Sequence, residues 1–253
     1  MIDQQVDCIE AMDVDHLDEL IQLQDSYWWH IAKRRLACSL LDCYFPAPAR
    51  VVEGGVGSAR NLLAFRDMGY EVAGFDIMPE AVSHAHGCGL HDVTVHDLSE
   101  PWPLASESVD AVVLLDVIEH IENPVAVLQS VREALKPGGG AIVTVPAYPW
   151  LYGDWDRQLG HFRRYTSAML REQVAAAGLR VEWLRHWNAF SLPPALVVRG
   201  YQRFAPRNRA ADFPRVSPLV NRALLACASV ERWCLVKKMP APFGLSLVGV
   251  LVK

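Results

Sequence analysis

Short apolar runs alternate with amphipathic stretches through the middle of the chain. Runs bounded by glycine, proline or polar residues are typical of buried strands, and stretches of helical period are typical of surface helices. Their alternation predicts an α/β fold of the Rossmann-like kind, with a mostly parallel seven-stranded sheet and helices on both faces. The expected strands are 50–53, 71–76, 93–97, 111–115, 141–145, 180–185 and 245–252, and the expected helices between them are 59–68, 79–86, 123–135 and 167–177.

Both ends of this alternation carry additional helical sequence. Residues 16–45 have apolar positions at helical spacing and predict an N-terminal helical cover, and the segment 188–242 predicts a helical insertion before the last strand. A turn is expected at 137–140, where proline precedes three glycines. The expected organisation is a cover over 1–48, a core over 49–187, and an insertion with the closing strand of the same domain over 188–253.

Composition and charge exclude some classes of function. The chain of 253 residues is 51% hydrophobic, and its net charge of −5 provides no overall positive field for nucleic acid. Basic runs at 157–164 and 199–209 leave contact with anionic head groups open. The six cysteines show no C-x-x-C or zinc spacing, and the acidic N-terminus does not look like a secretory signal, so we expect free thiols and a cytoplasmic protein.

The first strand is followed by a glycine-rich loop that could hold a polar ligand. Gly55 and Gly57 allow tight turning, and the helix after them offers unpaired N–H groups. Asp76 ends the next strand, where a carboxylate can accept hydrogen bonds from ribose hydroxyls. Arg60 stands where a dinucleotide fingerprint needs its third glycine, so NAD is the second choice.

Several motifs occur in the order found in one enzyme family. They are Val51 to Gly57, Gly74-Phe75-Asp76, His96-Asp97-Leu98, Asp110 to His120 and Leu135 to Gly139. From Tyr27 to Ala177 the chain resembles the class I S-adenosylmethionine-dependent methyltransferases, specifically the type 11 group of small-molecule enzymes. The resemblance implies that S-adenosyl-L-methionine is bound by Glu53, Gly55, Gly57, Asp76, Ile77, Asp97, Leu98 and Asp116.

Two features qualify this resemblance. Ala59 occupies a position where many family members have a third glycine, although the N–H donors of Gly55 and Gly57 remain. The tract 27–30, Tyr-Trp-Trp-His, is similar to an aromatic leader that covers the cofactor in part of the group, and it could equally be an aromatic staple onto the sheet. An NAD-dependent oxidoreductase and a catalytically silent cofactor-binding regulator are the alternative functions.

The methyl acceptor is expected beyond the fourth and fifth strands of the core. His161 or His120 could remove a proton from the acceptor, and we expect Trp155, Arg164 and Tyr165 to contact it. Asp116, Glu119 and His120 resemble a hard-metal set of the similar quinone-precursor O-methyltransferases, but this spacing is weak evidence and we expect no metal.

The sequence therefore predicts a methyltransferase that acts on a small-molecule or lipid-linked acceptor. It does not distinguish among oxygen, nitrogen and carbon as the acceptor atom. The insertion could be a lid, a homodimer interface or a peripheral membrane contact, and its arginines exclude a bilayer span.

Overall fold

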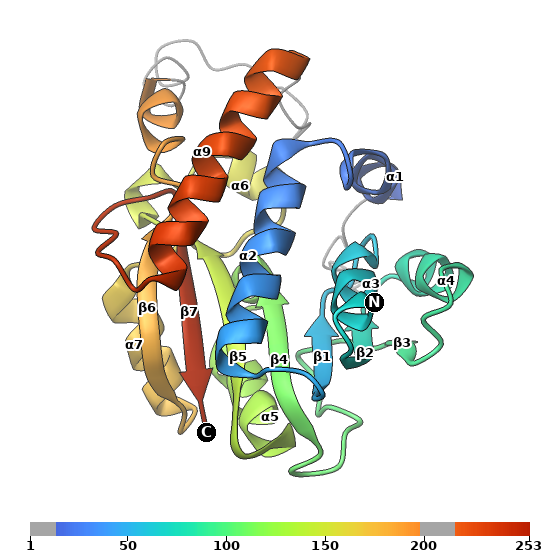
Figure 1. The fold of residues 1–253 in the computed structure, drawn as a ribbon. Coiled ribbons are helices and arrows are strands. Elements are labelled where there is room, and N and C mark those ends of the chain that lie inside the picture. Colours follow the sequence, from blue (N-terminus) through green and yellow to red (C-terminus); the bar gives the residue numbers. More distant parts are fainter. Residues whose placement is uncertain (1–13, 198–215) are drawn as a thin grey trace, which may run out of the picture.

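Seven strands form one sheet in the order β3-β2-β1-β4-β5-β7-β6 (Figure 1). The structure is a computed structural model, and it describes residues 14–197 and 216–253. Strands β1 to β5 run parallel, whereas β7 is antiparallel to both β5 and β6. The predicted seven-stranded, mostly parallel sheet is confirmed. The strands are β1 (Arg50–Gly54), β2 (Glu71–Asp76), β3 (Val93–Val95), β4 (Val109–Leu115), β5 (Leu135–Pro146), β6 (Arg180–Trp187) and β7 (Ser246–Val252).

Helices cover both faces of the sheet. One buried apolar cluster joins one face of the sheet to α2, α3, α4 and α9, and a second cluster joins the opposite face to α5 and α7. Asn123 begins α5 as the sequence predicts, because its Oδ1 accepts the Ala126 N–H at 3.4 Å. The main helices are α1 (Val14–Leu23), α2 (Trp28–Tyr44), α3 (Arg60–Asp67), α4 (Pro79–Gly87), α5 (Pro124–Ala134), α6 (Asp154–Gln158), α7 (Ser167–Ala176) and α9 (Pro218–Val236), with short 3-10 turns η1 (Ile118–His120) and η2 (Pro149–Leu151).

The register of the parallel strands sets the position of the site. Gly54, the last residue of β1, lies opposite Phe75 of β2 and Leu114 of β4. The loops after β1, β2 and β4 therefore leave the sheet at one edge. Ligands of open parallel sheets bind at this carboxyl edge, close to the first strands.

Two local predictions differ from the structure. The segment 16–45, expected to be helical, is divided into α1 and α2, and at the break the N–H of Trp28 bonds to Asn221 Oδ1 of α9 at 2.8 Å and not to an earlier turn. The turn expected at 137–140 lies inside β5: Leu135 pairs with Val109 and Gly140 with Ala111, so the glycines form a bulge within a strand.

The insertion before β7 is helical where it is described. Residues 192–197 are helical, and α9 runs beside α2 on the outer side of the sheet (Figure 1). Asn221 of α9 also donates to the carbonyl of Ser26 at 2.9 Å. The acidic residues before 14 and the basic run 199–209 lie outside the described residues. Within the described ranges, no helix combines the length and the apolarity needed to cross a bilayer.

Candidate active site

Two left-handed glycines shape the loop after β1. The φ angles are 73° at Gly55 and 51° at Gly57, a region that L side chains rarely adopt. A Cβ atom at Gly55 would lie 2.8 Å from Val117 Cγ2, so a side chain there would also clash. Ala59, at the place of the family's third glycine, has a φ of 61°. The loop thus keeps a glycine-like backbone at this alanine.

Asp76 connects this loop to the end of β2. Its Oδ2 accepts the N–H of Gly57 at 2.8 Å, and its Oδ1 accepts the N–H of Met78 at 2.9 Å. Burial raises the pKa of Asp76, although the bonds from Gly57 and Met78 oppose the shift. Each carboxylate oxygen can accept a further hydrogen bond. Asp76 can therefore hold the loop and accept ribose hydroxyls together.

The other residues predicted to bind the cofactor lie around the same edge. Glu53 is buried in β1, where Asn61 Nδ2 donates to its Oε1 at 2.7 Å and burial raises its pKa to about 8. Ile77 is 49% exposed after β2, and Asp97 is exposed in the loop after β3, next to the buried Leu98. All eight predicted residues come to or beside the carboxyl ends of β1 to β4: Glu53, Gly55, Gly57, Asp76, Ile77, Asp97, Leu98 and Asp116.

Helix α1 lies over the glycine loop. A Cβ atom at Gly57 would lie 3.0 Å from Leu20 Cδ2 of α1. Leu17 of the same helix is buried against Met78 and Ala81, which follow Asp76 in the chain. The predicted N-terminal helical cover is therefore found at the glycine loop.

The aromatic tract at 27–30 is a staple in this structure. The Trp29 ring stacks on Trp187 of β6 with 4.7 Å between centroids and 18° between planes. The ring of Trp28 lies 5.5 Å from that of Phe190, in the segment after β6. These contacts fix the start of α2 to β6, the strand at one edge of the sheet, and to the segment after it, as the staple alternative predicts.

Lys33 of α2 reaches the end of β4, a contact that the sequence alone does not reveal. Its Nζ lies 3.0 Å from Asp116 Oδ2, and Thr144 Oγ1 donates to Asp116 Oδ1 at 2.9 Å. Burial by itself would raise the pKa of Asp116, but Lys33 and Thr144 outweigh it and hold the pKa below its usual value. His30, three residues earlier, is buried, and burial followed by the charge of Lys33 lowers its pKa to about 3. At helical spacing Lys33 falls within the buried stripe that includes His30, Leu36 and Ala37, and a lysine in such a stripe is the signal that could have identified it.

Lys33→Met should lower the free energy of unfolding by about 2 kcal/mol, because it leaves the Asp116 carboxylate without its cation. The expected loss is below that of a fully buried pair, since the two side chains are 17% and 23% exposed. Urea denaturation at neutral pH measures it. Adding Asp116→Asn to the same variant should recover most of the loss. Purely additive losses would show that the two side chains are not coupled.

His161 and Asp156 form a hydrogen-bonded pair after β5. His161 Nδ1 lies 3.1 Å from Asp156 Oδ1, Arg164 Nε donates to the same oxygen at 2.7 Å, and the Gly153 N–H donates to Oδ2 at 2.9 Å. Burial alone would raise the pKa of Asp156, but these partners hold it below its usual value. A carboxylate at Nδ1 places the imidazole hydrogen there and leaves Nε2 free to accept a proton.

The three residues predicted to contact the acceptor have different environments. Tyr165 is fully buried and its hydroxyl donates to Ile118 O at 3.3 Å, so it supports the turn η1, and its contact with the acceptor stays a prediction. Arg164 bonds to Asp156 and to the carbonyl of Ala147, which makes it a positioning residue for Asp156. Trp155 is half-buried on α6, and its contact with the acceptor stays a prediction.

His120 and Glu119 lie next to this pair. The rings of His120 and His161 are 4.6 Å apart between centroids and perpendicular. Burial, with the nearby His161, lowers the pKa of His120 to about 4, so its imidazole is neutral at neutral pH. Glu119 is fully buried, and no described group bonds to either carboxylate oxygen. Burial raises the pKa of Glu119 well above its usual value, and the negative charge of Asp116 adds to this shift.

Three of these side chains could hold a metal ion. Glu119, His120 and His161 have ligand atoms within 4.8 Å of one another, and mixed nitrogen and oxygen ligands suit several divalent metals. The metal set that the sequence resembles contains Asp116, Glu119 and His120. In the structure His161 takes the place of Asp116, which is paired with Lys33. The expectation that the protein uses no metal stays a prediction.

The edge of the sheet also fits the cofactor that the sequence suggests. The left-handed glycines leave space for close backbone approach, and Asp76 has acceptor capacity left. The buried Glu53 Oε2 has no hydrogen-bond partner among the described residues. A ligand with hydroxyl and amino groups would satisfy these groups, and the histidine pair lies further along, beyond β4 and β5.

Comparisons with known proteins agree with this geometry. The profile of the family described as "Methyltransferase domain" matches residues 28–184. Over 159 residues the chain is 32% identical to a ubiquinone biosynthesis O-methyltransferase of Ruegeria pomeroyi, a match to 59% of this chain and 57% of that protein. A match at 30% identity to a Xanthomonas axonopodis protein of the same name covers 37% of this chain and 41% of that protein. The chain therefore spans about half the length of these curated relatives.

A solved structure shows the same fold. The crystal structure of a SAM-dependent methyltransferase from Archaeoglobus fulgidus gives a TM-score of 0.62 at 17% identity, over 95% of this chain and 100% of that chain. At this identity the likeness concerns the fold alone.

Proposed function

The chain belongs to the S-adenosylmethionine-dependent methyltransferases, and from this premise we propose that it methylates a hydroxyl oxygen of a small or lipid-linked acceptor. The observation that carries the proposal is the His161–Asp156 pair, a base with an orienting carboxylate 3.1 Å away. A hydroxyl, unlike a neutral amine, must lose its proton as the new bond forms. The name of the Ruegeria relative, an O-methyltransferase, supports oxygen as the acceptor atom.

In the proposed reaction His161 is the general base. When bound, S-adenosylmethionine would supply a methyl group on a sulfonium, with a neutral thioether as the leaving group. His161 Nε2 takes the proton of the acceptor hydroxyl while the O–CH3 bond forms. Asp156 stabilises the imidazolium that results, and Arg164 holds Asp156 in place.

Other residues hold the reactants in this proposal. The loop of Gly55 and Gly57, with Asp76, would hold the cofactor, and Leu20 of α1 would exclude water from above that loop. Alignment of the two reacting atoms supplies much of the rate in such a displacement. Lys33 fixes α2, and with it the staple, over the end of β4.

Isotope-labelled S-adenosylmethionine with a panel of phenols, alcohols and amines tests the proposal. We expect labelled methyl ethers and stoichiometric S-adenosylhomocysteine. Labelling of amines alone would contradict the oxygen assignment, and binding without transfer to any acceptor would favour a silent regulator.

Two further measurements separate the remaining alternatives. Calorimetry should detect binding of S-adenosylhomocysteine and none of NADH, since Arg60 replaces the third glycine of a dinucleotide loop. Turnover should persist in EDTA. Turnover that EDTA abolishes and Mg²⁺ or Zn²⁺ restores would instead make Glu119, His120 and His161 a metal site.

A further inference from the structure

Helix α9 has two apolar faces, and only one of them packs against other described residues. Ala228 and Leu235 are buried on the side that packs against α2, and Arg232 of this helix donates to Ser39 Oγ of α2 at 2.7 Å. The opposite side carries Leu219, Ala223, Ala226, Val230 and Trp233, all exposed and spaced by three or four residues; we call them the outer stripe.

The outer stripe is unusually apolar for a surface. Leu219 is 78% exposed, Val230 64% and Trp233 57%. A surface helix normally turns polar residues to water, and a helix that is apolar all round is normally covered. Among the described residues of α9, Arg222 is the one exposed polar residue. Lys237 follows the helix on the same side as the stripe.

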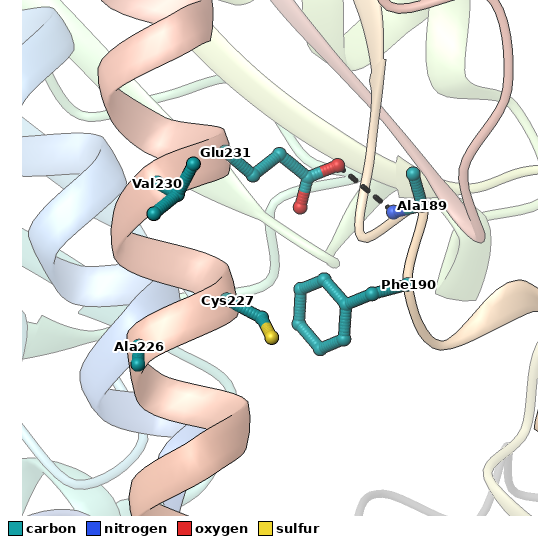
Figure 2. Close-up of a pocket in the computed structure, with 6 residues that line it drawn as sticks. All are labelled: Ala189, Phe190, Ala226, Cys227, Val230 and Glu231. Carbon is teal, nitrogen blue, oxygen red and sulfur yellow. Dashed lines mark hydrogen bonds between the residues drawn. The ribbon is translucent and has the colours of Figure 1, made fainter.

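An open apolar pocket adjoins the stripe. Figure 2 shows Phe190 turned toward Cys227, with Ala226 and Val230 on the same helix. The pocket has a volume of about 450 Å³. Glu231, the only acidic residue of α9, points away from the stripe, because its carboxylate accepts the N–H groups of Asn188 and Ala189 at 3.0 and 2.8 Å. No negative charge of α9 therefore remains on this side.

The insertion is strongly basic in an acidic chain. Residues 188–245 contain nine Lys and Arg against two Asp and Glu, a net charge of +7, whereas the whole chain carries −5. A twofold contact between two copies through the stripe would bring Arg222 and Lys237 of one copy close to those of the other, and such like charges oppose self-association. An anionic lipid surface offers both a counter-charge and an apolar layer.

We propose that the outer stripe of α9, with the adjoining pocket, binds the surface of an anionic phospholipid bilayer. Val230 and Trp233 enter the boundary of head groups and acyl chains, where tryptophan is favoured. Arg222 and Lys237 meet lipid phosphates at its margin. The helix lies along the surface and does not cross it. The proposal is independent of methyl transfer, since it uses α9 and the pocket beside it and no residue of the candidate active site.

Vesicle co-sedimentation of the full chain tests this surface. We expect binding to vesicles of equal parts phosphatidylcholine and phosphatidylglycerol, weak binding to pure phosphatidylcholine, and loss of binding in high salt. Val230→Asp should weaken binding roughly tenfold or more, because it removes apolar contact and adds repulsion. Lys237→Gln should weaken binding roughly fivefold.

A matched control is Met68→Asp, which places the same charge at an exposed apolar residue at the end of α3. It should bind vesicles as the unchanged protein does, and circular dichroism should show that each variant is folded. Equal binding to both vesicle types, no binding, or unchanged binding of a folded Val230→Asp variant would overturn the proposal. So would a stable dimer in sedimentation that Val230→Asp dissociates, since a second copy would then cover the stripe.

Discussion

His161→Ala is expected to reduce methyl transfer by about 10²–10⁴-fold, with the affinity for S-adenosylmethionine nearly unchanged. The variant removes the nitrogen that takes the acceptor proton, whereas the glycine loop and Asp76 lie at the other end of the edge. Turnover with a hydroxyl acceptor and calorimetry with S-adenosylhomocysteine measure the two effects separately.

Two further variants decide how His161 acts. Asp156→Asn keeps the shape of the orienting partner and removes its charge, so a base should lose most of its activity here too. His120→Ala should have the smaller effect, because His120 has no carboxylate bonded to it among the described residues. Full turnover in a folded His161→Ala variant would shift the assignment to His120.

Asp76→Ala should weaken the binding of S-adenosylmethionine by about 10- to 150-fold, which corresponds to roughly 1.5–3 kcal/mol for hydrogen bonds to a charged acceptor. Two losses combine in this variant. The ribose hydroxyls lose their acceptor, and the N–H groups of Gly57 and Met78 lose the oxygens that fix the loop. Calorimetry with S-adenosylhomocysteine measures the change.

The controls separate the ligand from the loop. Asp76→Asn retains one side-chain oxygen and should bind more tightly than Asp76→Ala. Asp92→Ala removes an exposed carboxylate just before β3 and should leave the affinity unchanged. Unchanged affinity in a folded Asp76→Ala variant would refute the placement of the ribose.

One helix connects several features of this molecule. Helix α2 carries the aromatic staple to β6, the pair from Lys33 to Asp116, and the surface against which α9 packs. A change at any of these contacts should therefore alter the position of α2 and, with it, the geometry of the candidate site. The Lys33 and Asp116 variants test the second of these three contacts.

The sequence alone was sufficient for the sheet and the cofactor edge. Apolar runs and glycine or proline turns are local signals, and they correctly predicted β1, β2 and β4 and the helices between them. Asp76 was placed correctly at the end of β2 because a strand boundary is also local. The family motifs then suggested the cofactor, and the match to residues 28–184 confirmed the family.

The acceptor side could not be derived in the same way. Lys33 and Asp116 are 83 positions apart, and they meet only because α2 packs over the end of β4. Arg164 and Tyr165 looked like acceptor contacts in the sequence, but folding turns one toward Asp156 and the other into the core. The predicted domain boundaries, the roles of Trp155 and Tyr165 and the cytoplasmic location stay predictions.

The division has a physical reason. Strand period and turn residues are set by neighbours in the chain, so the sequence by itself determined the strands, the helices between them and the edge where a ligand is expected. Which side chains meet at that edge depends on how distant helices pack against the sheet. Tertiary structure alone therefore decided that His161 lies against the Asp156 carboxylate, that Lys33 pairs with Asp116, and that the described residues leave one apolar face of α9 exposed.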